Sequence, residues 1–477
     1  MTAVTPFWLS GEATFGEGTV DVLSPYSGDL VGRVSIPTDE QVERAIADLD
    51  ASQRETLALP AHVRSRALDH VSAQLAARSE EIAALLVAEN GKPVMWARAE
   101  VNRAVSTFRW AAEEARRWSG HIQRLDTDPS ASGRMGLVRR FPRGPVLGIA
   151  PFNFPLNLVA HKVAPAIAVG APILVKPAMA TPLTAMLLAG IIAETDLPKG
   201  SVSFLPIPND RMDAINTDPR LPVISFTGGE GVGMRIRQSV PLKQVVLELG
   251  GDAAVMVEPD WPDLGSAARR IALFGCYQAG QSCISVQRVL VHADIYEEFV
   301  PLLTEAVQEL RTGDPSDSET QVGPMIDERN AVRITDWITD AVGKGATVLA
   351  GGGRTRAEVE PTLLTDVSPD AILAREEAFA PVLTVARYAD TDDGFRKVND
   401  SRYGLQAGVF TTRLDVAFRA QLELVVGGVV IGDVPSFRAD QMPYGGWKNS
   451  GIGREGVHSA MMDLTDDRIM VLTGLEL

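Results

Sequence analysis

The sequence contains two cysteines, Cys276 and Cys283, in different surroundings. Cys276 lies inside the apolar run 271–277, where a free thiol is most often a small buried hydrophobe. Cys283 follows Gly280-Gln281-Ser282, which predicts a loop or helix start whose backbone N–H groups can stabilise a thiolate. Cys283 is therefore the candidate nucleophile. For a cysteine taken alone, an inert thiol is the alternative.

Glu248 is a second residue whose position suggests a chemical role. Leu247-Glu248-Leu249 ends an apolar run and is followed by Gly250-Gly251. Burial there would raise the pKa of Glu248 and suit it to act as a general base. The alternative is a solvated turn residue.

A glycine-rich turn offers a place for phosphate. The segment 227–233, Thr-Gly-Gly-Glu-Gly-Val-Gly, follows a predicted strand and opens a predicted helix. Backbone N–H groups and the helix dipole can hold a phosphate at such a turn, so Gly228, Gly229 and Gly233 are candidate cofactor contacts. The spacing differs from the GxGxxG fingerprint, and a turn without a ligand is the alternative.

Repeated strand–helix patterns must position these residues. Short apolar runs alternate with helical patterns at 146–150, 173–176, 202–205, 223–227 and 245–249. Because parallel strands need crossovers, this alternation predicts a parallel sheet covered by helices on both faces. Such sheets bind nucleotides at the carboxyl ends of their strands. A capping box at 38–41 and a Gly-then-Pro stop at 91–93 predict helices from 39 and over 61–90, and a third is expected over 97–118.

We expect an α/β fold with a Rossmann-like cofactor domain, an α/β catalytic domain that carries Cys283, and a small β excursion. The second α/β pattern begins near Ala253, and short β-like runs rich in turn residues interrupt the first pattern after Gly120. The predicted boundaries are 1–119 and 143–250 for the dinucleotide-binding domain, 251–452 for the catalytic domain, and 120–142 with 453–477 for the excursion.

Seven short motifs follow one another along the chain. As an ordered set they are far more specific than any one of them alone. They are Pro151-Phe152-Asn153-Phe154-Pro155, Lys176-Pro177-Ala178, Phe226-Thr227-Gly228-Gly229, Leu247-Glu248-Leu249-Gly250-Gly251, Gly280-Gln281-Ser282-Cys283, Glu376-Glu377-Ala378-Phe379-Ala380-Pro381-Val382 and Pro443-Tyr444-Gly445-Gly446-Trp447-Lys448-Asn449-Ser450-Gly451. Together they resemble the aldehyde dehydrogenase superfamily over essentially the whole chain. The likeness is greatest to members that oxidise lactaldehyde, phosphonoacetaldehyde or, without phosphorylation, glyceraldehyde 3-phosphate.

The resemblance implies a role for three residues. Cys283 would attack the aldehyde to give a thiohemiacetal, whose oxyanion would be held by the Asn153 amide and the Cys283 backbone N–H. Loss of hydride to a nicotinamide would leave a thioester, and Glu248 would activate the water that hydrolyses it.

The resemblance also implies an NAD or NADP site, with NAD the preferred cofactor. Its residues would include Phe152, the glycine-rich turn and Lys176 at the adenosine ribose, with Glu377 and Phe379 at the nicotinamide ribose. Met179 stands where NAD-preferring members often have Glu, and without that carboxylate the rejection of a 2′-phosphate weakens. Gly229, often Ser in the family, is a milder departure.

Four basic side chains are candidates for the substrate tail. His161 stands at a position that commonly lines the substrate tunnel, and Arg109, Arg288 and Arg438 could add positive charge for a small polar or anionic aldehyde. Arginine suits phosphate or carboxylate because its guanidinium binds two oxygens at once. Ordinary salt bridges are the alternative for each arginine.

Composition excludes several other classes. Lys and Arg number 45 against 61 Asp and Glu, a net charge of −16, which argues against nucleic acid as a partner. We expect no metal, because the six histidines show no metal-binding spacing. We also expect no membrane partner and a cytoplasmic location, because no secretory or membrane-spanning segment is evident and two cysteines make no disulfide framework. By resemblance, the excursion is the oligomerisation segment of a homodimer or homotetramer.

Two rival functions stay open on the sequence. A CoA-acylating semialdehyde dehydrogenase would replace water by a thiol acceptor, which the presence of Glu248 disfavours. A non-catalytic dinucleotide-binding protein could keep the fold, but it would not need Asn153, Glu248 and Cys283 together.

Overall fold

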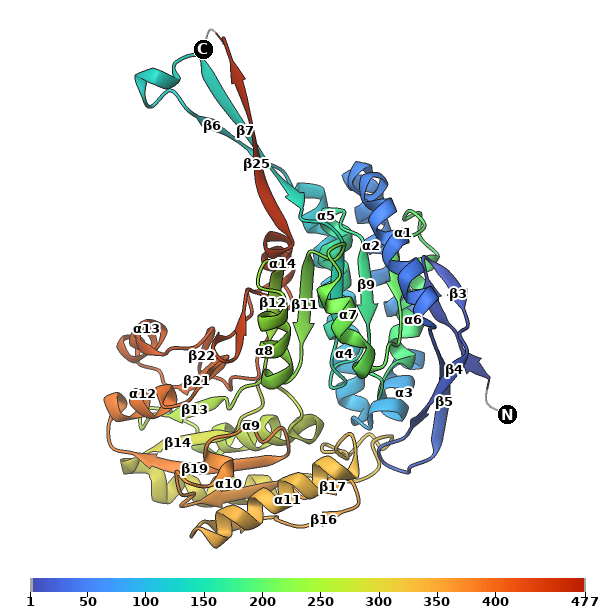
Figure 1. Cartoon of the computed structure of the whole chain (residues 1–477). Coiled ribbons are helices and arrows are strands. Elements are labelled where there is room, and N and C mark those ends of the chain that lie inside the picture. Colours follow the sequence, from blue (N-terminus) through green and yellow to red (C-terminus); the bar gives the residue numbers. More distant parts are fainter. Residues whose placement is uncertain (1–2, 476–477) are drawn as a thin grey trace.

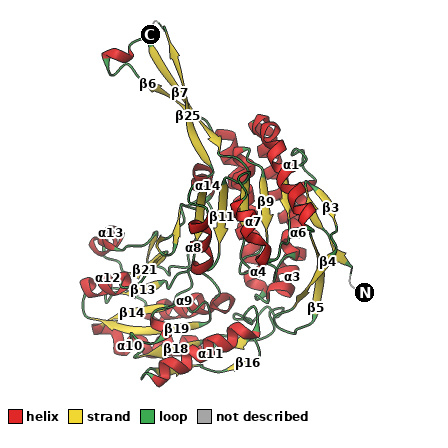
Figure 2. Ribbon diagram, in the orientation of Figure 1, coloured by secondary structure: helices red, strands yellow, loops and turns green. Residues whose placement is uncertain are grey.

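The computed structural model describes residues 3–475, which form two α/β bodies and a protruding β arm (Figure 1). Strands lie inside each body with helices around them (Figure 2). This arrangement confirms the predicted α/β class.

The first body is built on an eight-stranded sheet. Its order is β24 (Gly451–Ile452), β12 (Gln244–Glu248), β11 (Val223–Thr227), β8 (Val146–Ile149), β9 (Ile173–Lys176), β10 (Val202–Phe204), β2 (Phe7–Leu9) and β3 (Glu12–Thr14). The five strands from β12 to β10 are parallel, as the alternating pattern predicts. Both edges are extended by antiparallel strands that the pattern did not indicate.

Helices cover both faces of this sheet because its central strands are apolar throughout. They are α1 (Asp39–Ala58), α2 (Ala61–Ala77), α3 (Ser79–Asn90), α4 (Val94–Arg117), α5 (Asn157–Val169), α6 (Leu183–Ala193), α7 (Met212–Thr217), α8 (Glu230–Ser239) and α14 (Val457–Asp463). The Thr38 capping box starts α1 as expected. The single helix predicted over 61–90 is two helices, because Arg78 leaves the helical conformation. Gly91, with a left-handed φ of 75°, ends α3 as expected.

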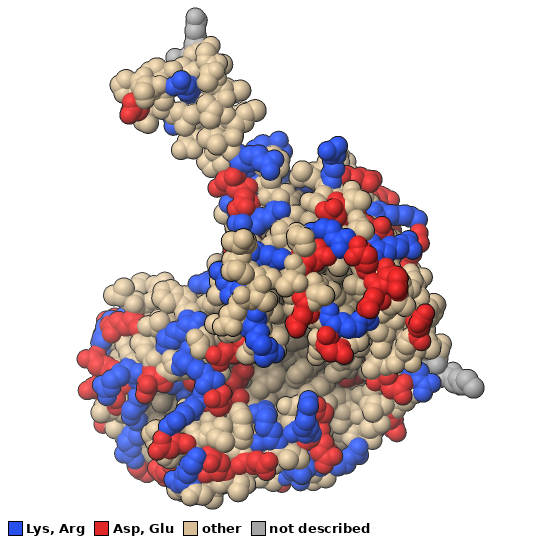
Figure 3. Space-filling model, viewed as in Figure 1, with Lys and Arg blue, Asp and Glu red and all other residues tan. Residues whose placement is uncertain are grey.

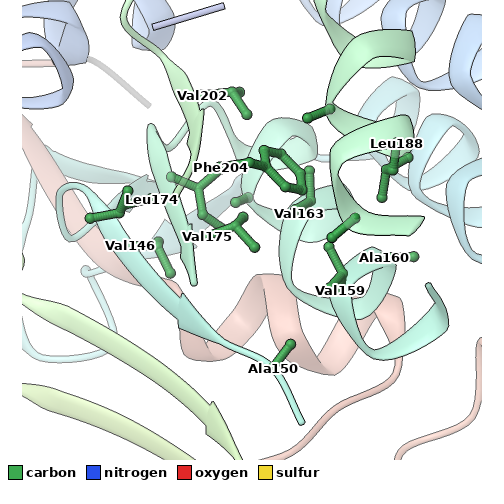
Figure 4. Packing of buried hydrophobic residues seen from close by; sticks show 14 of the residues in the cluster. Val146, Ala150, Val159, Ala160, Val163, Leu174, Val175, Leu188, Val202 and Phe204 are labelled. Atoms are coloured by element: carbon green, nitrogen blue, oxygen red, sulfur yellow. The ribbon is translucent and has the colours of Figure 1, made fainter. Parts of the chain in front are cut away.

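Close packing between α5, α6 and the strands fixes the first body. Val159, Ala160 and Val163 of α5 lie with Val175 and Phe204 of the sheet in one buried cluster (Figure 4). Burial of such side chains contributes roughly 1.5–3 kcal/mol each, so these elements give the strand ends a rigid support.

The second body is built on a seven-stranded sheet. Cys283 belongs to this body and lies between helix α9 (Leu264–Cys276) and strand β14 (Arg288–His292). The order of the sheet is β15 (Thr347–Ala350), β18 (Thr362–Thr365), β19 (Val382–Tyr388), β14 (Arg288–His292), β13 (Ala254–Val257), β21 (Gln406–Phe410) and β22 (Gly428–Ile431). All neighbours are parallel except β15 with β18. Its helices are α9 (Leu264–Cys276), α10 (Tyr296–Gln308), α11 (Glu328–Gly343), α12 (Thr391–Asn399) and α13 (Leu414–Glu423).

The arm is a three-stranded antiparallel sheet of β6 (His121–Arg124), β7 (Arg134–Pro142) and β25 (Thr465–Thr473). β25 pairs with β7 from Thr465 opposite Pro142 to Thr473 opposite Arg134. Two segments far apart in the sequence therefore build it, as predicted. In Figure 3 the visible face of the arm is mostly uncharged, whereas both bodies carry many charges.

Smaller strands complete the fold. β1 (Val4–Thr5), β5 (Leu30–Ile36) and β4 (Gly18–Leu23) form a sheet beside the first body. The other pairs are β16 (Arg354–Thr355) with β17 (Glu358–Val359) and β20 (Tyr403–Gly404) with β23 (Trp447–Lys448). Strand β24 and helix α14 pack on the first body although they follow the second one in sequence. The expected domain boundaries at 452 and 453 stay a prediction.

Candidate active site

A cavity of about 1310 Å³ reaches Cys283. Its walls come from the carboxyl ends of β8, β9, β11 and β12, from α8, and from second-body loops. Figure 3 shows the surface hollowed between the two bodies. Cys283, Glu248 and Asn153 all line this cavity, so the fold brings together the three residues expected to do chemistry.

Cys283 is the half-buried cysteine of the two, and its loop has unusual backbone geometry. Gln278, Ala279 and Gly280 all have positive φ, from 53° to 65°. Gly280 has no room for a side chain, because a Cβ atom would lie 2.0 Å from the Ala380 carbonyl oxygen. Burial raises the Cys283 pKa to about 12, although a hydrogen bond with Tyr444 opposes the rise. Cys276 is fully buried within α9, as expected of an inert thiol.

Glu248 ends β12 and is only 3% exposed. Within residues 3–475 neither carboxylate oxygen has a hydrogen-bond partner. Burial first, and then the negative charge of Glu455, raise its pKa well above the usual value. A buried carboxylate without partners is suited to take a proton, which agrees with the expectation for Glu248.

Asn153 lies against the loop of the nucleophile. Its Nδ2 donates to the Gln281 carbonyl at 2.9 Å. The Asn153 backbone carbonyl accepts from the buried Lys92 Nζ at 2.9 Å and from the Gln278 side chain. Lys92 is paired in turn with Glu100, whose Oε1 accepts from backbone N–H groups at the start of α5. This network fixes the Asn153 side chain beside Cys283.

The glycine-rich turn places open backbone at the start of α8. Gly228 and Gly229 line the cavity, and a Cβ atom on Gly229 would meet nothing within 4 Å. Gly233 does not line it: its Cβ would lie 2.5 Å from Leu249 Cδ2. Gly233 is therefore corrected from a cofactor contact to a packing residue that lets α8 approach β12.

Lys176 ends β9 on the same cavity. Its Nζ donates to Asn209 Oδ1 at 2.6 Å, and burial lowers its pKa to about 8. The cavity beside it is lined by Met179, in place of a carboxylate. A buried cation paired only with a neutral amide can bind a ribose hydroxyl or a phosphate oxygen.

Glu377 and Phe379 line the part of the cavity near the nucleophile. Glu377 Oε1 accepts from the Gly251 N–H at 3.0 Å, and burial raises the carboxyl pKa to about 7. The Phe379 ring meets Phe152 edge-to-face, with centroids 6.0 Å apart. All the predicted cofactor residues except Gly233 therefore share one cavity.

A cluster of buried charges, here called the charged cluster, adjoins Cys283 through Tyr444. It consists of Arg103, His161, Lys162, Arg438, Asp440 and Glu455. Tyr444 Oη lies 3.0 Å from Cys283 Sγ, and the Arg438 guanidinium stacks 3.8 Å from the Tyr444 ring centroid. Of the two cluster residues predicted from the sequence, Arg438 reaches Cys283 through Tyr444, whereas His161 pairs with Asp440.

The charged cluster is internally paired around two carboxylates. Asp440 Oδ1 accepts from Arg103 Nη2 at 3.0 Å and from His161 Nε2 at 3.2 Å. Glu455 Oε2 accepts from Arg438 at 2.9 Å, and its other oxygen lies 3.4 Å from Lys162. Burial opposes the charge of Glu455, but Lys162 and Arg438 outweigh it and hold its pKa at about 2.

Two donor or acceptor atoms of the charged cluster have no hydrogen-bond partner within residues 3–475. They are Arg438 Nε and His161 Nδ1. Burial and the Arg438 charge lower the His161 pKa, so the ring is neutral. Because the ionised Asp440 accepts from Nε2, Nδ1 is an acceptor lone pair. Both atoms are buried inside the charged cluster, and neither residue lines the cavity.

Two predicted substrate residues lie elsewhere. Arg288 belongs to β14, where it pairs with Asp252 and donates to the carbonyls of Lys397 and Val398. It ties β14 to the end of α12 and is corrected to a structural residue. Arg109 is exposed on α4 with its guanidinium 5.8 Å from the Trp110 ring centroid, and it does not line the cavity.

Arg103 is an arginine of the charged cluster that sequence reasoning missed. It lies six residues before Arg109 on α4, on the side of the helix that meets Asp440. The helical period could have separated the two, because Arg103 falls between the buried residues Glu100 and Thr107 whereas Arg109 does not share their face.

No group of three or more His, Cys, Asp or Glu in residues 3–475 could hold a metal ion. No helix over the same range has the length and apolar character needed to cross a bilayer.

The fold and the site define an α/β enzyme with a cysteine at the end of a long cavity between two bodies. Residues 11–470 match the model of the Aldehyde dehydrogenase family. The chain belongs to this family and is an NAD(P)-dependent aldehyde dehydrogenase, which confirms the resemblance read from the seven motifs.

Relatives and solved structures agree over the whole chain. It is 38% identical to 3-sulfolactaldehyde dehydrogenase of Priestia aryabhattai over 466 residues, 98% of this chain and 97% of the relative. The crystal structure of aldehyde dehydrogenase 21 from Physcomitrella patens, in complex with the reaction product succinate, has a TM-score of 0.98 and 40% identity, covering 100% of this chain and 99% of that one. The NADP-dependent glyceraldehyde-3-phosphate dehydrogenase of Bacillus halodurans, complexed with NADP, has a TM-score of 0.95 and 33% identity, covering 99% and 100%.

Proposed function

We propose that the protein oxidises a small aldehyde with an anionic tail to the carboxylic acid, through a thiohemiacetal and a thioester on Cys283. The observation that carries this proposal is the charged cluster, whose Arg438 stacks on Tyr444, the residue in contact with Cys283, while Cys283 also borders the cavity. The names of the sulfolactaldehyde and glyceraldehyde-3-phosphate dehydrogenases, and the succinate product of aldehyde dehydrogenase 21, support the anionic tail.

The cavity residues fit a dinucleotide. An open glycine turn at the start of α8, the buried Lys176 cation and the Glu377 carboxylate line one cavity with Cys283. When bound, NAD or NADP supplies the acceptor for the hydride. We propose that both bind, since Lys176 has an amide partner and Met179 brings no carboxylate to reject a 2′-phosphate.

In the first half-reaction the Cys283 sulfur bonds to the aldehyde carbon, and the thiol proton passes to Glu248. The oxygen becomes an oxyanion that accepts from the second N–H of Asn153 Nδ2 and from the Cys283 backbone N–H. When the oxyanion collapses, hydride leaves the carbon and a thioester remains on Cys283.

In the second half-reaction water replaces the sulfur. Glu248 first releases the thiol proton to solvent and is a carboxylate again. It then takes a proton from the water as the water oxygen bonds to the thioester carbon, and the C–S bond breaks to release the acid and the Cys283 thiolate. The raised pKa of Glu248 makes it a stronger base than an exposed glutamate.

The substrate tail would meet the charged cluster. Arg103 and Arg438 can donate to a carboxylate, sulfonate or phosphate, and the lone pair on His161 Nδ1 can accept from a hydroxyl. We therefore propose a hydroxylated or short-chain aldehyde that ends in an anion.

The test is an absorbance assay of reduced nicotinamide over neutral, carboxylated, sulfonated and phosphorylated aldehydes with both dinucleotides. We expect kcat/KM to be highest for anionic aldehydes and no rate in Cys283→Ala, while Cys276→Ala keeps its activity. Neutral aldehydes oxidised as well as anionic ones would refute the tail assignment. A CoA thioester as product, formed only when CoA is added, would replace hydrolysis by acyl transfer.

We also propose a homodimer or homotetramer in the cytoplasm. Leu414, Phe418 and Leu422 form an exposed apolar stripe on α13, and β25 is an unpaired edge of the arm with Ile469 and Met470 exposed. Exposed apolar stripes and strand edges favour association. Light scattering should give at least twice the 51.2 kDa chain mass, and Phe418→Glu should lower it.

A further inference from the structure

We propose that the Tyr444 hydroxyl donates a hydrogen bond to the Cys283 thiolate and so favours loss of the thiol proton, with Arg438 stacked on the ring as its electrostatic support. This catalytic role for Tyr444 rests on the proposed role of Cys283 as the nucleophile. It deepens that role, because it names the group that stabilises the charged sulfur before substrate binds.

The geometry is specific to these two side chains. Tyr444 Oη and Cys283 Sγ lie 3.0 Å apart, which is close for a contact that involves sulfur. Within residues 3–475, neither of these two side chains makes any other hydrogen bond. A thiol and a hydroxyl can each be donor or acceptor, but a thiolate has no proton. Once Cys283 is ionised, Tyr444 must therefore be the donor.

Tyr444 is held rigidly in this position. Its backbone N–H donates to the Glu455 carbonyl at 3.0 Å, and its carbonyl accepts from the Glu455 N–H at 2.6 Å. The ring packs with Ile284 and Leu405 in a small buried cluster that Cys283 also contacts. Because the ring is fixed by backbone bonds and packing, the hydroxyl loses little entropy when it binds the thiolate.

Arg438 makes the hydroxyl a better donor. Its guanidinium is buried and stacks 3.8 Å from the ring centroid, so its positive charge stabilises electron density on the phenol oxygen and on the nearby sulfur. Burial keeps the Tyr444 pKa well above its usual value, so the proton remains on the hydroxyl across the working pH range. Other charges around the pair work in both directions: Glu248 and Glu377 disfavour a thiolate, and Arg103, His161, Lys162, Asp440 and Glu455 complete the surroundings.

Glu248 and Tyr444 would then have separate tasks. Glu248 Oε1 lies near Gly445, where an added Cβ atom would be 3.0 Å away, so the base is adjacent to Tyr444 in space but makes no hydrogen bond to it. The thiol proton leaves Sγ for the Glu248 carboxylate, and the electron pair left on sulfur accepts from Tyr444. No proton leaves Tyr444 in this step, so charge and protons balance.

The experiment measures the rate of Cys283 alkylation by iodoacetamide from pH 6 to the highest pH at which the protein stays folded, in the full-length protein without aldehyde, by peptide mass spectrometry. Tyr444→Phe removes one hydroxyl and keeps the ring. We expect its alkylation midpoint to move to higher pH, with alkylation at pH 7.5 roughly tenfold slower, the loss typical of a hydrogen bond to a charged group. The matched control is Tyr403→Phe, whose hydroxyl accepts from Arg402 away from Cys283. Cys276 should stay unmodified in every variant and so reports that each one is folded.

A second variant gives the opposite sign. 3,5-Difluorotyrosine at position 444 is a more acidic phenol and a stronger donor, so the midpoint should fall below that of the wild type. A Tyr444→Phe midpoint that is unchanged or lower would overturn the proposal, as would no difference with the fluorinated residue. Failure of the proposed function is a separate result, in which Cys283→Ala still oxidises aldehyde.

Discussion

The cavity and the charged cluster both reach Cys283, but they are built differently. The cavity is a space of about 1310 Å³ whose wall combines apolar side chains, the backbone of the glycine-rich turn and scattered polar side chains. The charged cluster is closely packed, and its six ionisable side chains are paired around Asp440 and Glu455. A long dinucleotide can be recognised by shape and backbone N–H groups, whereas a small substrate offers few contacts and must be recognised by charge. Mutations in the two regions should therefore separate cofactor effects from substrate effects.

The largest effect is expected where the regions meet. Glu248→Gln should lower turnover by roughly 10²–10⁴-fold, because the amide cannot take a proton from water. A burst of reduced cofactor should still approach the enzyme concentration, since hydride loss precedes hydrolysis. It should form more slowly than in the wild type, because Glu248 also takes the thiol proton. Stopped-flow absorbance measures both phases.

The same residue predicts a pH dependence. Below its raised pKa Glu248 is protonated and cannot act as a base, so turnover should rise with pH through that pKa. Glu248→Gln should lose this limb. If the limb persists in the variant, another group limits the rate.

A smaller loss is expected for the oxyanion donor. Asn153→Ala should lower turnover by about 10²–10³-fold, the usual effect of removing one such donor. The binding constant of the dinucleotide should stay the same, as measured by quenching of protein fluorescence. An equal loss of cofactor affinity would mean that Asn153 shapes the cavity instead.

The charged cluster should set substrate preference. Arg103→Gln should lower kcat/KM for anionic aldehydes roughly 10–100-fold, the equivalent of a lost hydrogen bond to a charge, and leave neutral aldehydes nearly unchanged. Arg109→Gln is the matched control on the same helix, because Arg109 is exposed. Equal losses for both classes of aldehyde would contradict an anion site.

The smallest expected effect lies at the far end of the cavity. Met179→Glu should disfavour NADP relative to NAD by roughly tenfold, since a carboxylate repels the 2′-phosphate and binds ribose hydroxyls. The ratio of the two kcat/KM values, measured with one aldehyde, tests this. An unchanged ratio would place the ribose away from Met179.

Local pattern predicted much of the framework. The strands predicted at 173–176 and 223–227 match β9 and β11 residue for residue, because a strand buried on both faces is mostly apolar along its length. The break at Arg78 and the antiparallel strands β2, β3 and β24 were not predictable in this way. They depend on which elements the chain finds as neighbours, and local propensity does not record this.

The candidate site divides in the same manner. The types and positions of Cys283, Glu248 and Asn153 could be read directly, and so could their likeness to one family. Arg288 and Arg438 look alike in the sequence, since each is an arginine near a motif. Only the fold distinguishes them. The Arg438 guanidinium stacks on the Tyr444 ring, whereas Arg288 donates hydrogen bonds to carbonyls at the end of α12.

The sequence by itself determined the alternation of strands and helices and the candidates for the nucleophile and the base, because each depends on residues close together in the chain. Tertiary structure decided which charges surround the nucleophile. The contact between Tyr444 and Cys283 joins residues 161 positions apart, and that between Arg103 and Asp440 joins residues 337 apart. Such contacts come from the packing of distant elements, and their energies depend on a burial that no local segment possesses.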